Sequence, residues 1–171
     1  MTKVAVIGNA GGGKSILSKK LAQAKSLPAH RVDTYQWNSG WQPIPETDVR
    51  EKLNALLGND RWIIDGWGPW DSIVRRFQEA DTIIFIDYPV WIHLWWAMKR
   101  QIRALFLPRT IDKPEGCDLR SVTVRMFRMI LSINKNVTPT VRALVAQHKK
   151  DKSVFHITSR KGLREFVSAH C

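Results

Sequence analysis

Short apolar runs alternate with helical patterns along the whole chain. The runs are four to six residues long, and continuous apolar runs of this length are typical of strands buried on both faces of a parallel sheet. The five predicted strands are Val4–Ile7, His30–Asp33, Trp62–Gly66, Thr82–Asp87 and Ser153–Thr158. Between and after them, apolar residues recur at helical spacing, which predicts helices over residues 14–25, 46–57, 90–107, 119–134, 139–150 and 162–169.

No repeat, low-complexity tract or linker interrupts this alternation. Residues 1–171 are therefore predicted to form one α/β domain, with a parallel sheet covered by helices on both faces. Residues 34–45 and 109–118 are expected to be loops.

The first strand runs directly into a glycine-rich loop. Residues Gly8, Asn9, Ala10, Gly11, Gly12, Gly13, Lys14 and Ser15 match the pattern G-x-x-x-x-G-K-[ST] in full. Backbone N–H groups can wrap a triphosphate only where no Cβ intrudes, and a helix beginning near Gly13 directs its free N–H groups at the same phosphates. We predict that this loop binds ATP, that Lys14 neutralises the β and γ phosphates, and that Ser15 ligates Mg²⁺.

Three of the predicted strands end on an aspartate, so three carboxylates are expected at one edge of the sheet. Asp65 follows a fully apolar strand, and we predict that it holds Mg²⁺ or a water of its shell. Asp87 precedes Tyr-Pro, and we interpret it as a cap of the following turn. Asp33 fits either role.

The whole chain has a net charge of +12, and most of this charge lies in its second half. Residues 1–98 hold 11 Lys and Arg against 10 Asp and Glu, whereas residues 99–171 hold 16 against five. This surplus indicates an anionic partner, either nucleotide phosphates, nucleic acid or an acidic surface, unless it only solubilises the chain.

Cysteine usage favours a reducing compartment. Cys117 and Cys171 show no framework spacing, and two cysteines cannot build a zinc site. The most apolar later stretch, residues 83–98, is broken by Asp87 and Pro89. We expect a cytoplasmic protein with no membrane partner, acting as a monomer or weak homodimer.

An ordered set of motifs gives the chain a family resemblance. The motifs are the loop Gly8–Ser15, "HRVDTYQWNSGW" at 30–41, "WIIDG" at 62–66, "RFQEADTIIFIDYP" at 76–89, the basic helix with Lys99 and Arg100, and "ITSRK" at 157–161. Together they resemble the adenylate-kinase-related P-loop proteins, and specifically the DNA topology modulation proteins of the FlaR type.

This resemblance implies a P-loop nucleotide-kinase-like fold with three layers and a sheet of strand order 2-3-1-4-5. It further implies an acceptor-binding segment at about residues 34–58 and a small lid at about 103–135. The resemblance also implies that the phosphate loop and the residue after it, Ile16, contact the nucleotide. Arg76 and Arg100 would grip phosphates, and Arg160 would lie beside the nucleotide base.

The chain also departs from the pattern of these proteins. Ile16 stands where relatives usually carry a threonine, and Trp96 stands where they carry an arginine. Residues 133–138 hold asparagines and a threonine where arginines are common. These losses bear on turnover more than on nucleotide binding, and the remaining cations that can take their place are Arg103, Arg109, Arg125 and Arg128.

The function predicted from these residues is transfer of the ATP γ-phosphate to a nucleoside monophosphate or another small acceptor. Lys14 and Mg²⁺ would stabilise the transferred group, and a lid arginine (Arg100, Arg103 or Arg109) would close over it. Asp33 would serve a hydroxyl acceptor as base.

An aromatic wall for the acceptor is a further hypothesis. Trp37, Trp41, Trp67 and Trp70 fall in predicted loops that flank the acceptor site, and ordinary aromatic packing is the alternative explanation for each of them.

The alternative function is a nucleic-acid-associated ATP-binding protein with weak or no kinase turnover. Lys99, Arg100 and Arg103 share one predicted helical face, and Trp95 and Trp96 lie beside them for stacking. Nucleotide phosphates explain the same arginines without a nucleic acid.

Overall fold

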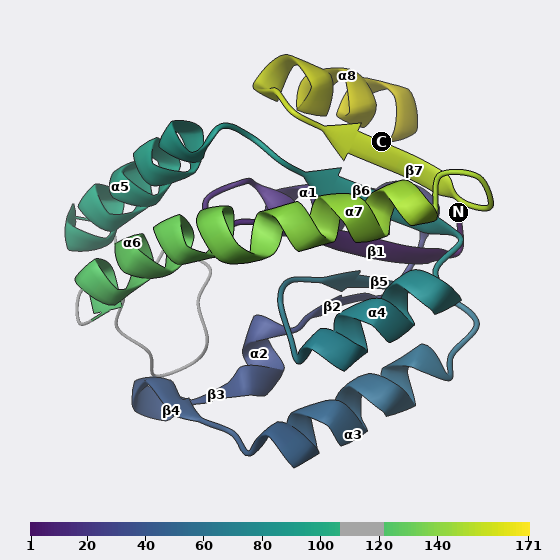
Figure 1. Cartoon of the computed structure of the whole chain (residues 1–171), viewed down its shortest axis with the longest axis horizontal. Helices are drawn as coiled ribbons and strands as arrows, with labels where there is room; N and C mark the ends of the chain where they lie inside the picture. Colours follow the sequence, from purple (N-terminus) through teal and green to yellow (C-terminus); the bar gives the residue numbers. More distant parts are fainter. Residues whose placement is uncertain (107–121) are drawn as a thin grey trace.

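The computed structural model describes residues 1–106 and 122–171 and contains a five-stranded parallel sheet. The strands are β1 (Lys3–Gly8), β2 (Ala29–Arg31), β5 (Trp62–Asp65), β6 (Thr82–Ile86) and β7 (Ser153–Ile157). Their order across the sheet is β2-β5-β1-β6-β7 (Figure 1), which is the predicted order 2-3-1-4-5 of the five apolar runs. The predicted fold class is therefore confirmed.

Helices cover both faces of the sheet because alternate side chains of each strand point to opposite faces. The helices that cover it span Lys14–Lys25 (α1), Glu46–Leu57 (α3), Trp70–Glu79 (α4), Thr138–Gln147 (α7) and Arg160–His170 (α8). Val4 and Val6 pack towards α1 and α8, whereas Ala5 and Ile7 pack towards α3, α4 and α7. Helix α4 lies outside the predicted set, although Ile73 and Phe77 are buried at helical spacing on it.

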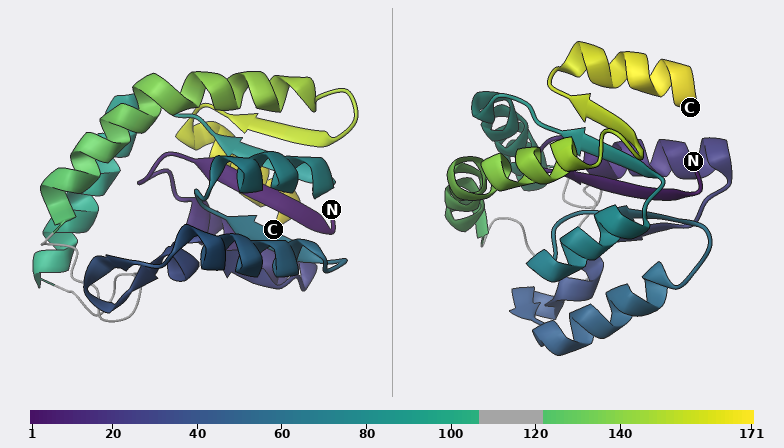
Figure 2. Two further views of the ribbon diagram at one scale, coloured as in Figure 1. Left: turned by 60° about the horizontal axis from the view of Figure 1, so that its bottom comes forward. Right: turned by 45° about the vertical axis from the view of Figure 1, so that its right-hand side comes forward.

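Two further helices, α5 (Val90–Phe106) and α6 (Thr123–Ser132), lie side by side at one end of the sheet (Figure 2). Ala97 of α5 packs with Met126 and Ile130 of α6. A π-helical turn over Ile133–Val137 joins α6 to α7, and Pro139 stands in the first turn of α7, where a missing N–H is tolerated. The two helices predicted over 119–134 and 139–150 are thus connected without a loop.

The segment after β2 differs from the expected strand and loop. The strand ends at Arg31, and Asp33 opens the short helix α2 (Asp33–Gln36), because the Val32 N–H bonds to the Asp65 carbonyl and the chain then turns. A small antiparallel pair follows, β3 (Trp37–Asn38) with β4 (Gln42–Pro43). Residues 107–121, which include the predicted site residue Arg109, the predicted loop 109–118 and part of the predicted lid, fall outside the described part of the chain. Of the helices within the described ranges, none is long and apolar enough to span a membrane.

Candidate functional site

The loop between β1 and α1 has a backbone that only glycine fits at two positions. Gly8 has a φ of +153°, and a Cβ on it would lie 2.4 Å from the Ile86 carbonyl oxygen of β6. Gly11 has a φ of +75°, and a Cβ there would lie 2.7 Å from the His93 carbonyl oxygen of α5. The loop is therefore pressed between β6 and α5, and its bare backbone is a requirement of the fold as well as of phosphate binding.

The start of α1 presents an anion-binding arrangement. Gly13 precedes the helix in the left-handed conformation, and no side chain caps the first N–H groups. Lys14 Nζ donates a hydrogen bond to the Asn9 carbonyl oxygen at 3.1 Å, so its charge spans the loop. Free N–H groups, the positive end of the helix dipole and a lysine converge here, as a phosphate site requires.

Two contacts from α5 and α6 hold the loop in place. Asn9 Nδ2 donates to the Ile130 carbonyl oxygen at 2.8 Å, and His93 Nδ1 lies 3.0 Å from the Ala10 carbonyl oxygen. Asn9 and His93 are both buried. Sequence reasoning placed Asn9 in the loop without this role and missed His93, since neither tertiary contact leaves a sequence signal.

Asp65 lies at the carboxyl end of β5, beside the loop. Its side chain is buried, and its Oδ1 has no hydrogen-bond partner. Burial raises the pKa of Asp65, while the Lys14 ammonium and the Ser15 hydroxyl oppose that rise. An unpartnered buried carboxylate oxygen next to a hydroxyl and a lysine fits the oxygen ligands that Mg²⁺ takes together with substrate phosphates.

Asp33, Arg31 and Arg100 gather near Asp65. A Cβ on Gly66, the residue after Asp65, would lie 3.5 Å from Asp33 Oδ1. Burial lowers the pKa of Arg100, and Asp33 opposes that shift, so α5 carries Arg100 close to the start of α2. Arg31 acts on the pKa values of both Asp65 and Arg100, and sequence reasoning overlooked it because it lies inside a predicted strand.

Arg76 lies beneath this cluster and is not open to it. It is buried, its Nη1 donates to the Gly66 carbonyl oxygen at 2.8 Å, and its Nη2 has no partner. Burial lowers its pKa to about 10, and Asp65 opposes the shift. Arg76, which was predicted to bind a substrate phosphate, here supports the turn after β5.

Two predicted acceptor residues form an aromatic pair. The rings of Trp37 and Trp41 meet edge to face, with centroids 5.7 Å apart. Arg125 of α6 lies over the Trp37 ring, with Cζ 5.7 Å from the centroid. Arg125 therefore links the predicted acceptor segment to α6.

The predicted base-binding residue Arg160 begins α8 and lies over the ring of Trp96, with Cζ 4.6 Å from the centroid. Lys99 Nζ lies 5.2 Å from the centroid of the same ring.

Ile16 is exposed and lines, with Gly13 and Leu163, a cavity of about 310 Å³ between α1 and α8. Arg103 is exposed on α5.

The prediction that Asp87 caps the following turn is wrong. Its carboxylate instead accepts hydrogen bonds from Arg142 Nε at 2.7 Å and Nη2 at 3.0 Å. His156 Nε2 of the neighbouring strand lies 2.8 Å from the same carboxylate. Burial alone would raise the pKa of Asp87, but these two partners outweigh it and lower that pKa. Asp87 therefore joins α7 to the edge of the sheet.

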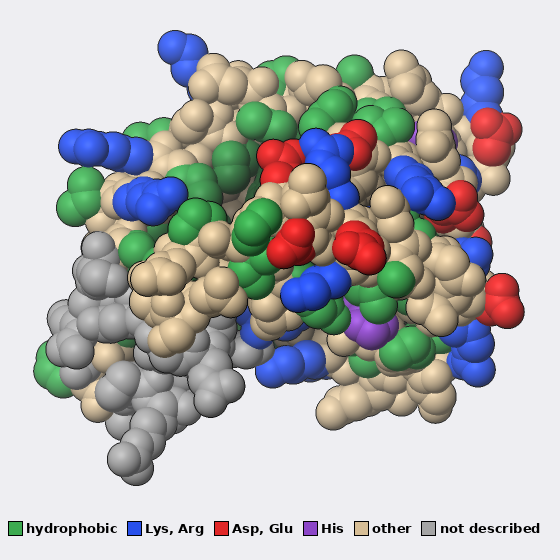
Figure 3. Space-filling view, turned by 90° about the horizontal axis from the view of Figure 1, so that it is seen from below, with side chains coloured by type: hydrophobic (Ala, Val, Ile, Leu, Met, Phe, Trp, Pro, Cys, Tyr) green, Lys and Arg blue, Asp and Glu red, His purple; other side chains and the backbone are tan. Residues whose placement is uncertain are grey.

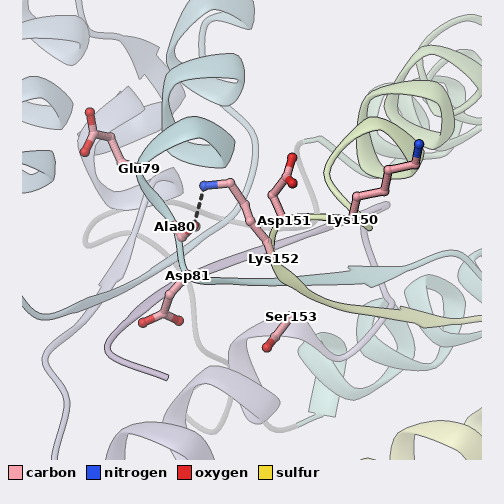
Figure 4. Close-up of a pocket in the computed structure, with 7 residues that line it drawn as sticks. All are labelled: Glu79, Ala80, Asp81, Lys150, Asp151, Lys152 and Ser153. Carbon is pink, nitrogen blue, oxygen red and sulfur yellow. Dashed lines mark hydrogen bonds between the residues drawn. The ribbon is translucent and has the colours of Figure 1, made fainter.

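A larger hollow of about 530 Å³ lies at the opposite end of the sheet (Figure 4). Lys152 Nζ crosses it to donate to the Gln78 and Ala80 carbonyl oxygens, both at 2.6 Å. Asp81 also lines it and accepts from the backbone of Lys3 at 3.0 Å. Lys152 and Asp81 are thus bonded within the fold, and none of the predicted site residues lines the hollow.

Solved structures resemble the whole chain, at low sequence identity. Shikimate kinase from Acinetobacter baumannii is 14% identical, with a TM-score of 0.59 over 99% of this chain and 90% of that one. A sugar kinase from Janibacter sp. HTCC2649 is 12% identical, with a TM-score of 0.54 over 97% of this chain and 90% of that one. Shikimate kinase from Aquifex aeolicus is 16% identical, with a TM-score of 0.51 over 97% and 91%.

No protein-family model and no curated protein matches the sequence. The similarity therefore lies in the fold. The chain has the fold of the P-loop kinases, with the phosphate loop following the central strand of the sheet.

Proposed function

We propose that this protein is an ATP-dependent phosphotransferase of the adenylate-kinase-related, FlaR-type group, acting on a small anionic acceptor in the cytoplasm. The observation that carries the proposal is the buried, unpartnered carboxylate oxygen of Asp65 beside Lys14 and Ser15. A complete phosphate loop alone predicts nucleotide binding. A carboxylate kept available at its edge adds the means to hold the metal that phosphoryl transfer needs.

On the donor side, the loop backbone and the start of α1 hold the β and γ phosphates, and Lys14 neutralises their charge. Ser15 and Asp65 hold Mg²⁺, which, when bound, withdraws charge from the transferred phosphoryl group. Arg160 and Trp96 line the approach beside α8, where the nucleotide base would lie. Ile16 supplies no hydroxyl for the α-phosphate, so its contact is apolar.

On the acceptor side, Arg31 and Arg100 attract an anionic group, and Asp33 receives a proton if the acceptor is an alcohol. Trp37 and Trp41 offer ring faces and edges to a base or sugar. We place the acceptor in the segment of residues 34–58, and the lid over 103–135, within a single domain of residues 1–171. A nucleoside monophosphate needs the arginines and no general base. A small hydroxy acid needs Asp33 as a general base as well.

The test is ADP release from Mg-ATP with a panel of nucleoside monophosphates and small hydroxy acids, for the native chain and for Asp33→Asn. Stimulation by one acceptor supports the proposal. Loss of kcat in Asp33→Asn with KM for ATP unchanged indicates a hydroxyl acceptor, whereas an unchanged kcat indicates a phosphate acceptor. Binding of ATP without stimulation by any acceptor contradicts phosphotransfer.

A second candidate is a nucleic-acid-associated ATP-binding protein. The observation in its favour is Lys99 Nζ, which lies 4.9 Å from the ring centroid of the exposed Trp95. Binding to duplex DNA that weakens steeply between low and moderate salt supports this candidate.

A further inference from the structure

The outward face of α5 carries a row of large apolar side chains, termed here the apolar stripe. The stripe consists of Trp91, Trp95, Met98, Ile102 and Phe106, which are 65%, 47%, 37%, 49% and 77% exposed. Their spacing of four, three, four and four residues places them within an arc of about 80° of the helix surface. The opposite face, with His93, Ala97, Gln101 and Ala104, is buried against the protein.

The stripe is larger than scattered exposed apolar residues would explain. Along nearly the whole length of one helix, five bulky apolar groups are presented to solvent on the same face, and such a contiguous patch marks a binding surface. None of these five side chains belongs to the phosphate loop or to the cluster around Asp65. The nucleotide reaction therefore does not account for them.

Charge around the stripe selects the kind of partner. Lys99 and Arg103 are exposed along one side of it, and the sequence holds no Asp or Glu from residue 88 to 107 or from 122 to 150. Helix α6 lies beside α5 and exposes Val124, Arg125, Arg128, Met129 and Leu131. The face that carries α3 differs, because acidic and basic side chains alternate there (Figure 3), and Arg50 pairs with Glu46 and Asp71.

We propose that the apolar stripe of α5, with its flanking cations, docks the protein on an anionic lipid bilayer. A helix with tryptophan and phenylalanine on one face and Lys or Arg beside them buries its apolar face at the boundary of headgroups and acyl chains. The cations gain from the negative surface potential, each by an amount that salt reduces. Such docking needs no spanning helix, so the expectation of no membrane partner, which considered spans, does not bear on it.

Two other occupants fit the same face less well. A second copy of this chain would bring one acid-free cationic face against another, which charge disfavours. Nucleic acid would pair with Lys99 and Arg103, but Met98, Ile102 and Phe106 have no counterpart on a phosphate backbone. A bilayer satisfies both the apolar and the cationic groups.

The experiment is flotation of the full chain with vesicles of phosphatidylcholine alone and with vesicles of equal phosphatidylcholine and phosphatidylglycerol, at low and moderate salt. The variant is Trp91→Gln with Trp95→Gln, and the matched control is Trp70→Gln on α4, which replaces a comparably exposed tryptophan. We expect binding to the anionic vesicles, little binding to phosphatidylcholine alone, and an affinity about tenfold or more lower in the double variant. Trp70→Gln should bind like the native chain.

Thermal unfolding of each variant checks that the fold is intact, and Met98→Gln with Ile102→Gln repeats the test on the same stripe. Lack of binding to anionic vesicles at low salt overturns the proposal. So does equal loss in Trp70→Gln. Self-association or duplex DNA binding that the stripe variants abolish, while vesicle binding stays unchanged, assigns the face to a second copy or to nucleic acid instead.

Discussion

The side chain of Asn9 in the phosphate loop donates a hydrogen bond to the carbonyl oxygen of Ile130 in α6, across 121 residues of sequence, at 2.8 Å. Five residues earlier on the same helix, Arg125 lies over Trp37 of the predicted acceptor segment. Helix α6 therefore contacts both the phosphate loop and the predicted acceptor segment. A change in the position of α6 would alter both contacts.

Replacement of Asn9 by alanine should loosen the phosphate loop. The buried Ile130 carbonyl would lose its side-chain partner, which costs about 1–2 kcal/mol of unfolding free energy. Denaturant unfolding measures the loss, and calorimetric titration should show weaker Mg-ATP binding. Asn54→Ala, at an exposed asparagine that accepts from Arg75, is the control and should change neither quantity appreciably. Equal effects of the two substitutions would refute the anchoring role.

Gly11→Ala should distort the loop more severely. A Cβ at this position would meet the His93 carbonyl oxygen at 2.7 Å and would be held at a φ of +75°. We expect a loss of ~1–3 kcal/mol in stability and an Mg-ATP affinity too weak to measure by calorimetry. Gly58→Ala, where the nearest atom would lie at an ordinary 3.5 Å, should be neutral in both measurements. Normal ATP binding by Gly11→Ala would mean that the loop adapts.

Arg142→Ala should destabilise the fold in a pH-dependent way. The pairing lowers the pKa of Asp87 below its ordinary value of 3.8, so the stabilisation exists above that value and is lost as the pH falls through the lower folded value. Because Arg142 is half exposed, we expect a loss of only ~1 kcal/mol at neutral pH. Unfolding curves from neutral to strongly acidic pH should converge for the two proteins. Arg75→Ala serves as the control, and a pH-independent difference would exclude the ion pair as the cause.

Arg125→Ala should act on the acceptor and spare ATP. It removes the cation from the Trp37 ring, a contact worth about 0.5–1 kcal/mol at a partly exposed site. Once the acceptor is identified, its KM should rise two- to fivefold while the affinity for Mg-ATP stays constant. Trp37→Leu should show the same pattern, and the exposed Arg128→Ala should not. Unchanged acceptor KM in both Arg125→Ala and Trp37→Leu would show that neither this contact nor the aromatic wall contributes to acceptor binding.

The fold was predictable because its strands are short and apolar and its phosphate loop is complete. Val4–Ile7 and Thr82–Ile86 are buried on both faces, and a buried strand leaves a continuous apolar run in the sequence. Helix α4 was harder, because polar residues surround Ile73 and Phe77 and the buried face is narrow. The position of α4 is determined by the sheet, against which Ile73 and Phe77 pack.

Within the candidate site, the sequence pointed to the loop, Asp65, Asp33 and Arg100, but not to Arg31. Arg31, Asp33 and Arg100 come from β2, α2 and α5, and no local pattern encodes that they lie near one another. Arg76 shows the reverse, since a charged side chain predicted to meet substrate is buried under Gly66. Asp87 found its partners on α7 and β7, which only the tertiary fold brings together.

Calorimetric titration with Mg-ATP measures whether the loop holds the phosphates of ATP through Lys14. We expect saturable binding by the native chain and by Lys52→Ala, an exposed lysine on α3, and an affinity at least tenfold lower for Lys14→Ala. Equal affinity of Lys14→Ala and the native chain, or no binding by the native chain, would exclude this role of the loop.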